Sequence, residues 1–332
     1  MHSSLLITIV IIVLALVFDF INGFHDTATV VATSISTRAL SPKAAIGLCA
    51  VFNFLGAFIS TAVAKTVGSG IVDDRLIPLW VIAAVLVAAI TWDLLTWYFA
   101  IPSSSSYALI GALIGGAIAF SKSFSIVDWG NLFDEVILWL FLSPIIGLIV
   151  GYIFMVILNK LVGSSKPRKV NKLFQRLQII SAIFMALNHG ENDSQKSMGI
   201  ITMALISGGF LGAFNVPLWV IFLCATAMGL GTALGGKRII KTMGNGVTKL
   251  NPVSGFAAQS AAGAIIAMAT AFKAPVSTTQ IITTSIMGAG AEKSIKRVKW
   301  GVAKTIVWAW VLTIPGAAIL AFIYVEIVKL FM

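Results

Sequence analysis

Long apolar stretches, separated by short polar loops, extend over the whole chain. The main stretches cover residues 5–18, 44–63, 79–95, 136–158, 216–230 and 302–325. An α-helix needs roughly 20 apolar residues to cross a bilayer, and most of these stretches reach or approach that length. The pattern therefore predicts an all-α polytopic membrane protein.

Composition supports the same class. Of the 332 residues, 58% are hydrophobic and 11% are charged, and the mean hydropathy is +1.00. A soluble domain carries roughly a quarter charged residues, so this chain has too few to cover a surface in water. The first apolar stretch lacks a basic head and a small-residue cleavage site, so we expect it to stay in the mature fold. Cys49 and Cys224 lie in apolar stretches and predict neither a disulfide nor a metal framework.

The net charge of +11 comes mostly from short loops between the apolar stretches. Basic loops stay in the cytoplasm, so this charge predicts contact with membrane lipid and requires no nucleic-acid partner. Six basic and no acidic residues lie between Lys160 and Arg176, which predicts a cytoplasmic loop. We therefore divide the chain into a first repeat (1–160), a basic cytoplasmic linker (161–175) and a second repeat (176–332).

Corresponding loops of the two halves differ in charge, whereas parallel repeats would keep the same bias. The three comparisons are basic 38–43 against uncharged 207–217, acidic 73–75 against basic 237–249, and acidic 122–135 against basic 292–299. This reversal predicts two inverted-topology repeats with both termini outside. The segments 79–100 and 103–120 begin and end on one side, so two spans and a re-entrant hairpin both fit.

A short polar motif interrupts an apolar stretch in each half. Gly-Phe-His-Asp-Thr-Ala at 23–28 aligns with Gly-Glu-Asn-Asp-Ser-Gln at 190–195, so Asp26 corresponds to Asp193. Ionisable residues at membrane depth are usually functional and paired with an ion. We expect the first motif to break its helix, with Asp26 near the N-cap of a helix that restarts at Thr27. We expect the second motif to do the same. His25 adds a side chain that titrates near physiological pH.

Each half also contains a proline followed by hydroxyl residues: Pro102 with Ser103–Ser106, and Pro275 with Ser277, Thr278 and Thr279. A proline and hydroxyls at a helix start gather free amides and donors at the positive end of the helix dipole, where anions bind. Broken or re-entrant helices that meet near the bilayer midplane could therefore surround a tetrahedral oxyanion. Nearby carboxylates would repel that anion unless a cation or proton neutralises them, which predicts cation-coupled anion uptake.

At these motifs the chain resembles the inorganic phosphate transporter (PiT) family, of the bacterial low-affinity phosphate permease type. The resemblance covers residues 22–28, 101–106, 189–199, 229–236 and 275–279. It implies inverted repeats, outside termini and symport of phosphate with protons or sodium across the cytoplasmic membrane. It assigns the anion to Ser103, Ser104, Ser105, Ser277, Thr278 and Thr279, and the coupling cation to Asp26, Asn192 and Asp193. His25 joins the cation group because it titrates.

Several residues depart from the family pattern. His25 stands where sodium-coupled members typically have Asn, which favours a proton; Asp26 and Asp193 would be the metal ligands if sodium were coupled. Thr29 replaces a common Asn, and Tyr107 and Gln280 replace a usual His.

The alternatives left open are sulfate, a metal–phosphate complex, sodium coupling and a homodimer. Phosphate is favoured over sulfate because its O–H can donate to Asp26 or Asp193. A passive channel would not need paired carboxylates beside an anion site. An enzyme is disfavoured because no nucleophile–base pair appears, and we expect no cofactor.

Overall fold

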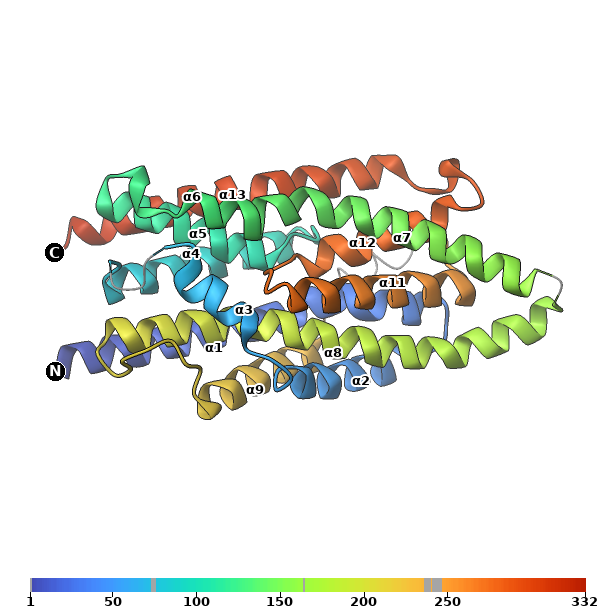
Figure 1. Ribbon diagram of the computed structural model, residues 1–332, viewed down its shortest axis with the longest axis horizontal. Helices are drawn as coiled ribbons and strands as arrows, with labels where there is room; N and C mark the ends of the chain where they lie inside the picture. The colour runs from blue at the N-terminus through green and yellow to red at the C-terminus, as the bar shows by residue number, and fades with distance from the viewer. Residues whose placement is uncertain (1, 73–75, 164, 236–239, 241–246) are drawn as a thin grey trace.

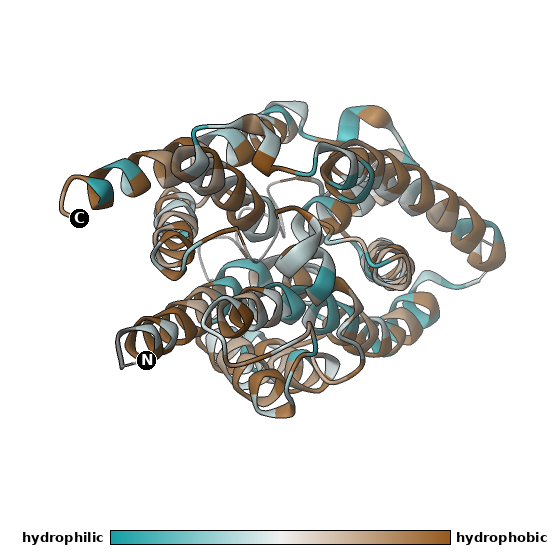
Figure 2. Cartoon of the chain, turned by 60° about the vertical axis from the view of Figure 1, so that its left-hand side comes forward, coloured by the Kyte–Doolittle hydropathy of each residue, from teal (hydrophilic) through white to brown (hydrophobic). Residues whose placement is uncertain are grey.

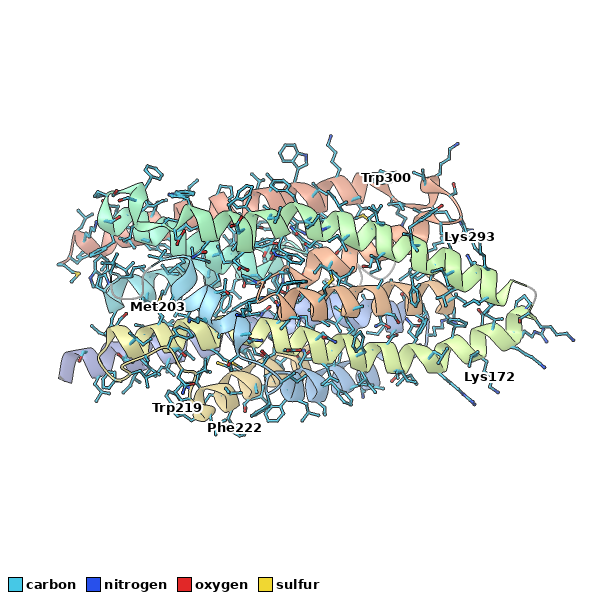
Figure 3. All side chains as sticks on the ribbon, in the orientation of Figure 1. Lys172, Met203, Trp219, Phe222, Lys293 and Trp300 are labelled. Carbon is cyan, nitrogen blue, oxygen red and sulfur yellow. The ribbon has the colours of Figure 1, made fainter. Side chains whose placement is uncertain are left out.

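The computed structural model describes residues 2–72, 76–163, 165–235, 240 and 247–332, which form a bundle of helices. Most helices run along the long axis of the molecule (Figure 1). Both termini lie at one end, and the connection between α7 and α8 lies at the other. Lys172 and Lys293 lie at that second end (Figure 3). Of the loops compared by charge, residues 73–75 and Lys237, Arg238 and Lys241 lie outside the described residues.

The elements of the first half are α1 (His2–Ser36), α2 (Pro42–Gly56), α3 (Ala62–Lys65), η1 (Thr66–Gly70), α4 (Leu79–Tyr98), α5 (Ser105–Ser121), η2 (Phe124–Ile126), α6 (Trp129–Leu132), η3 (Phe133–Ile137) and α7 (Leu138–Val162). Those of the second half are α8 (Pro167–Ser207), α9 (Leu218–Leu234), α11 (Pro252–Ala271), α12 (Thr278–Ala291), η4 (Ile295–Arg297) and α13 (Trp300–Lys329).

The protein is an all-α, multi-pass membrane protein, as the hydropathy pattern predicts. Five helical segments of the described chain are long and apolar enough to cross a bilayer: Ser4–Ser36, Leu79–Tyr98, Trp129–Val162, Pro252–Ala271 and Trp300–Lys329. Large apolar side chains on their outer faces are exposed, among them Val307, Trp308 and Val311 on α13. Figure 2 shows apolar residues dominating these helices and hydrophilic residues gathered at the bundle ends and in its middle.

The packing partners correspond between the two halves. Helix α1 packs on α4 and α9, and α8 packs on α11 and α2 in the equivalent way. Helix α5 packs on α13, and α12 packs on α7. Helices of each half therefore pack against helices of the other half. This packing places the two polar motifs in the middle of one bundle. The inverted orientation of the halves and the division into repeats and linker remain predictions.

The expected helix breaks at the two polar motifs are wrong, because α1 and α8 run through them without interruption. The glycines of the two motifs allow helices to cross at close distance instead. A Cβ on Gly23 would clash with the backbone of α9 at Met228, and a Cβ on Gly190 would clash with that of α2 at Asn53. The polar side chains find partners across these crossings, so the backbone does not have to unwind to satisfy them.

The breaks occur at the hydroxyl motifs, as predicted. Helix α4 ends before Phe99 and α11 before Phe272, and the next residue in each case, Ala100 or Lys273, has a positive φ of 55° or 62°. The left-handed residue turns the chain back toward the bundle centre. Each proline then lies two residues before the helix N-cap rather than at the first helical position.

Candidate functional site

The first motif forms a chain of hydrogen bonds inside the bundle. His25 and Asp26 are each 1% exposed, and His25 Nδ1 lies 2.6 Å from Asp26 Oδ1. The other ring nitrogen, Nε2, lies 3.3 Å from Thr96 Oγ1 on α4. Ser103 Oγ donates to the same Thr96 oxygen at 2.8 Å. The predicted cation residues of α1 are therefore connected through Thr96 to the hydroxyl turn before α5.

The second motif gathers charged groups around one carboxylate. Lys196 Nζ forms an ion pair with Asp193 Oδ1, three residues earlier on α8. Thr278 Oγ1, in the first turn of α12, donates to Asp193 Oδ2 at 3.2 Å. His189 Nε2 lies 3.1 Å from the same oxygen. All four side chains are buried, so the Asp193 carboxylate depends on these groups rather than on water.

The two motifs meet at the centre of the bundle. Ligand atoms of Asp26, His189 and Asp193 all lie within 4.8 Å of one another, although they come from α1 and α8. Two carboxylates and one imidazole at this spacing could hold a cation; their oxygens suit a hard ion such as sodium better than the nitrogen does. The structure thus brings together the two aspartates that the repeated motif aligns.

The two hydroxyl turns also meet. Ser106 Oγ donates to the carbonyl oxygen of Val276 at 3.2 Å. Ser104 and Ser277 are the N-caps of α5 and α12, and each side chain accepts a backbone N–H at 3.3 Å. Both predicted helix starts are confirmed. Ser103 and Ser104 precede α5, Ser105 opens it, and Thr278 and Thr279 open α12.

Two of these hydroxyl groups are available to a ligand. Ser105 Oγ and Thr279 Oγ1 are buried and have no partner at hydrogen-bond distance within the described part of the chain, although the Ser105 hydroxyl faces the Asp93 carboxylate. They come from the first turns of two different helices, whose N-terminal amides attract negative charge. A buried polar atom without a partner costs free energy, and a bound oxyanion would remove that cost.

Asn192 has a positioning contact. Its Nδ2 donates to Thr270 Oγ1 at 2.9 Å and to the carbonyl oxygen of Ala274 at 3.2 Å. These bonds attach α8 to the turn between α11 and α12. Asn192 Oδ1 is buried and makes no hydrogen bond to a described residue, so it remains available to a cation.

Three buried charged residues received no role from the sequence: Asp19, Asp93 and Lys196. Asp93 lies in the apolar stretch 79–95, and its carboxylate faces Ser105. Both Asp93 carboxylate oxygens lack a hydrogen-bond partner among the described residues. The signal that could have found Asp19 and Asp93 is a single charge inside an otherwise apolar span.

A polar cavity of about 540 Å³ lies beside this site. Two lysines line it, Lys65 on α3 and Lys273 before α12, together with Glu135 from η3. Thr66 Oγ1 donates to the carbonyl oxygen of Lys273 at 3.0 Å, so the two walls of the cavity are connected. The walls are also bonded to the second motif: Gln195 Oε1 accepts the Val63 amide at 2.6 Å, and Asn192 bonds to Ala274.

A model of the phosphate transporter family matches residues 22–321. The chain belongs to this family. It is 49% identical over 323 residues to a probable low-affinity inorganic phosphate transporter of Bacillus subtilis, covering 96% of both chains. A protein of the same description from Rhizobium meliloti is 44% identical over 94% of this chain and 93% of its own. The family and both relatives are described as transporters, not enzymes.

A solved structure titled "The sodium-dependent phosphate transporter" superposes with a TM-score of 0.88. It covers 98% of this chain and 100% of its own, at 21% sequence identity. This likeness confirms the all-helical fold of the chain.

Proposed function

We propose that this transporter takes up inorganic phosphate across the cytoplasmic membrane together with a coupling cation, and that the cation is a proton. One observation carries the proposal. The aspartates of the two repeated motifs lie in one buried centre. Asp193 accepts a hydrogen bond from the hydroxyl turn of α12, and Asp26 is linked to that of α5 through His25 and Thr96. Each turn also holds a buried hydroxyl without a described hydrogen-bond partner. Such an arrangement offers adjacent places to a cation and to an oxyanion.

The anion is assigned to the two helix starts. Ser105 and Thr279 offer hydroxyl donors from opposite halves, and Ser103, Ser104, Ser277 and Thr278 surround them. Phosphate has four oxygens and can therefore accept bonds from both helix starts at once. The names of the bacterial relatives support phosphate as the anion.

Hydrogen-bond direction favours phosphate over sulfate. Asp93 presents two carboxylate oxygens beside Ser105, and both are without a described partner. Protonated phosphate can donate an O–H to such an oxygen, whereas sulfate at neutral pH has none to donate. Sulfate would therefore lack this hydrogen bond at Asp93. Sulfate remains the alternative anion of the proposal.

Charge balance requires cations. The buried centre holds two aspartates, Asp26 and Asp193, and one lysine, Lys196. A phosphate anion adds further negative charge, so cations must enter with it. The His25–Asp26 pair is a suitable proton acceptor, because imidazole nitrogen binds a proton better than it binds sodium. The cluster of Asp26 and Asp193 oxygens is the observation that favours sodium as the second candidate.

One uptake experiment tests the proposal. The purified protein is reconstituted into proteoliposomes, and labelled phosphate or labelled sulfate is supplied under an imposed proton or sodium gradient. We expect phosphate to accumulate with an inward proton gradient and to stop when a protonophore is added. Accumulation of sulfate but not phosphate would reject the anion assignment. Sodium-driven uptake that a protonophore leaves unchanged would reject the proton.

A further inference from the structure

Lys196 is the buried basic residue that the proposed mechanism does not use. Its side chain is 1% exposed, and the buried residues of the described chain include no other lysine or arginine. Its ammonium pairs with Asp193 and lies 3.4 Å from the carbonyl oxygen of Val276, in the hydroxyl turn before α12. Lys196 therefore places a positive charge between the second motif and the proposed phosphate position.

Asp193 is fully engaged by groups of the protein. Lys196 occupies Oδ1, while Thr278 and His189 lie within 3.2 Å of Oδ2. Both oxygens that could bind a mobile cation thus already face a donor or a charged group. The carboxylate and the ammonium cancel each other's formal charge without any ion from solution.

The first motif lacks such a group. The residue three positions after Asp26 is Thr29, which aligns with Lys196 but is neutral. Its hydroxyl donates to the backbone carbonyl oxygen of Asp26 at 2.7 Å and brings no charge to the carboxylate. Asp26 pairs instead with His25, whose ring can be neutral or charged. The two aligned aspartates therefore differ in their counter-charge: Asp193 has the permanent ammonium of Lys196 in addition to an imidazole, whereas Asp26 has an imidazole alone.

We propose that the Lys196 ammonium is a built-in counter-cation that replaces a mobile cation at Asp193. Only the Asp26 half then takes up a cation from solution with each phosphate. Because Lys196 cannot leave the protein, it contributes charge to phosphate binding but carries none across the membrane. The inference rests on the proposed phosphate uptake and adds the number of cations that accompany each anion.

A purely structural ion pair is the competing explanation. Buried ion pairs are often no more stabilising than apolar side chains of similar size, so stability alone gives little reason to keep one here. The position of the ammonium against the hydroxyl turn of α12 fits a role in the site better than a role in packing. The two explanations differ in what they predict for charge transport.

The test measures the charge moved per phosphate, from the reversal potential of labelled phosphate flux in proteoliposomes. Phosphate uptake by the unmodified protein is established first, so a failure of the proposed function is seen before any variant is compared. Lys196→Gln should move one more positive charge with each phosphate than the unmodified protein, since a mobile cation now fills the vacant position. Asp193→Asn should move one fewer. Two variants should move the same charge per phosphate as the unmodified protein. They are the charge-conserving Lys196→Arg and the double variant Asp193→Asn/Lys196→Gln.

Size-exclusion chromatography of each variant in detergent shows whether it folds. If Lys196→Gln fails to fold, the Asp193→Asn variant and the double variant decide the question. An unchanged charge per phosphate in Lys196→Gln or Asp193→Asn would overturn the proposal. A double variant that does not fold would also overturn it, because the pair would then be needed for structure rather than for charge balance.

Discussion

Buried polar residues of the centre form hydrogen bonds that connect four helices. Thr27 of α1 and Thr232 of α9 share a hydrogen bond of 2.8 Å, and Asn53 Nδ2 of α2 donates to the same Thr232 oxygen at 2.9 Å. Asn53 Oδ1 lies 3.2 Å from His189 Nδ1 of α8. The orientation of His189 toward Asp193 is therefore fixed by an amide in the other half. His25, His189 and Asp193 each have a neutral partner that positions them, which is Thr96, Asn53 and Thr278 in turn.

Removing an available hydroxyl should weaken phosphate binding without affecting a helix cap. Ser105→Ala and Thr279→Ala each delete a donor that makes no hydrogen bond within the described residues. A lost bond to a charged ligand is worth about 1.5–3 kcal/mol, so the KM for phosphate should rise roughly tenfold or more. Uptake kinetics in proteoliposomes measure this change. Ser121→Ala is the control, because that hydroxyl bonds to Ala117 at the far end of α5.

The N-cap serine of the same helix gives a different expected result. Ser104→Ala removes the acceptor for the Tyr107 amide, which costs roughly 1 kcal/mol of stability in addition to any effect on phosphate. Its melting temperature in detergent should therefore fall, while that of Ser105→Ala stays close to the unmodified value. Equal melting temperatures and equal KM values for the two variants would contradict this division of roles.

The exchangeable charge at Asp26 should depend on the imidazole of His25. His25→Asn replaces a proton-accepting nitrogen with a neutral amide oxygen, which suits sodium better. We expect uptake by this variant to lose its dependence on a proton gradient and to become sensitive to sodium. The measurement is phosphate uptake at fixed membrane potential over a range of external pH. A pH profile identical to that of the unmodified protein would exclude His25 as the proton carrier.

At the scale of elements, local signals were predictive and long-range ones were not. Pro102 and Pro275 with their hydroxyl residues predict helix starts, because capping depends on neighbours within four residues. The continuity of α1 and α8 could not be predicted, since the partners that satisfy their polar motifs, such as Thr96 and Asn53, lie far away in sequence. Asp93 carries a local signal, a charge inside an apolar span, but its position beside Ser105 depends on the fold.

The crossing of α8 over α2 should depend on Gly190. A methyl group there would meet the backbone carbonyl of Asn53, which cannot move like a flexible side chain. Gly190→Ala should therefore destabilise the protein by about 1–3 kcal/mol, the usual cost of overpacking. A lower melting temperature in detergent would show this. Gly47→Ala on α2 is the matched control, because a Cβ there meets nothing within 4 Å, and it should leave the melting temperature unchanged or raise it.

At the scale of the whole molecule, the two ends of the bundle differ in charge. The end that holds both termini carries Asp128, Asp134 and Glu135 near α6. The opposite end carries the α7–α8 connection with Lys172, and Lys293 (Figures 1 and 3). Basic residues remain on the cytoplasmic side, so the termini are expected outside. The cavity of Lys65 and Lys273, bordered by Asn131 and Glu135, would then open toward the outside and attract anions to the site.

Single cysteines at the two ends should therefore label from opposite sides of the membrane. Ser165 lies between α7 and α8, and Asn131 lies in α6 at the end that holds the termini. Cys49 and Cys224 are buried and would be replaced first, so that each variant carries one accessible thiol. In intact cells, a membrane-impermeant maleimide should react with Asn131→Cys. It should react with Ser165→Cys only after the membrane is permeabilised. Labelling of both positions from outside would contradict the assigned orientation. Reaction of Ser165→Cys alone would reverse the orientation and place the lysine-lined cavity on the cytoplasmic side.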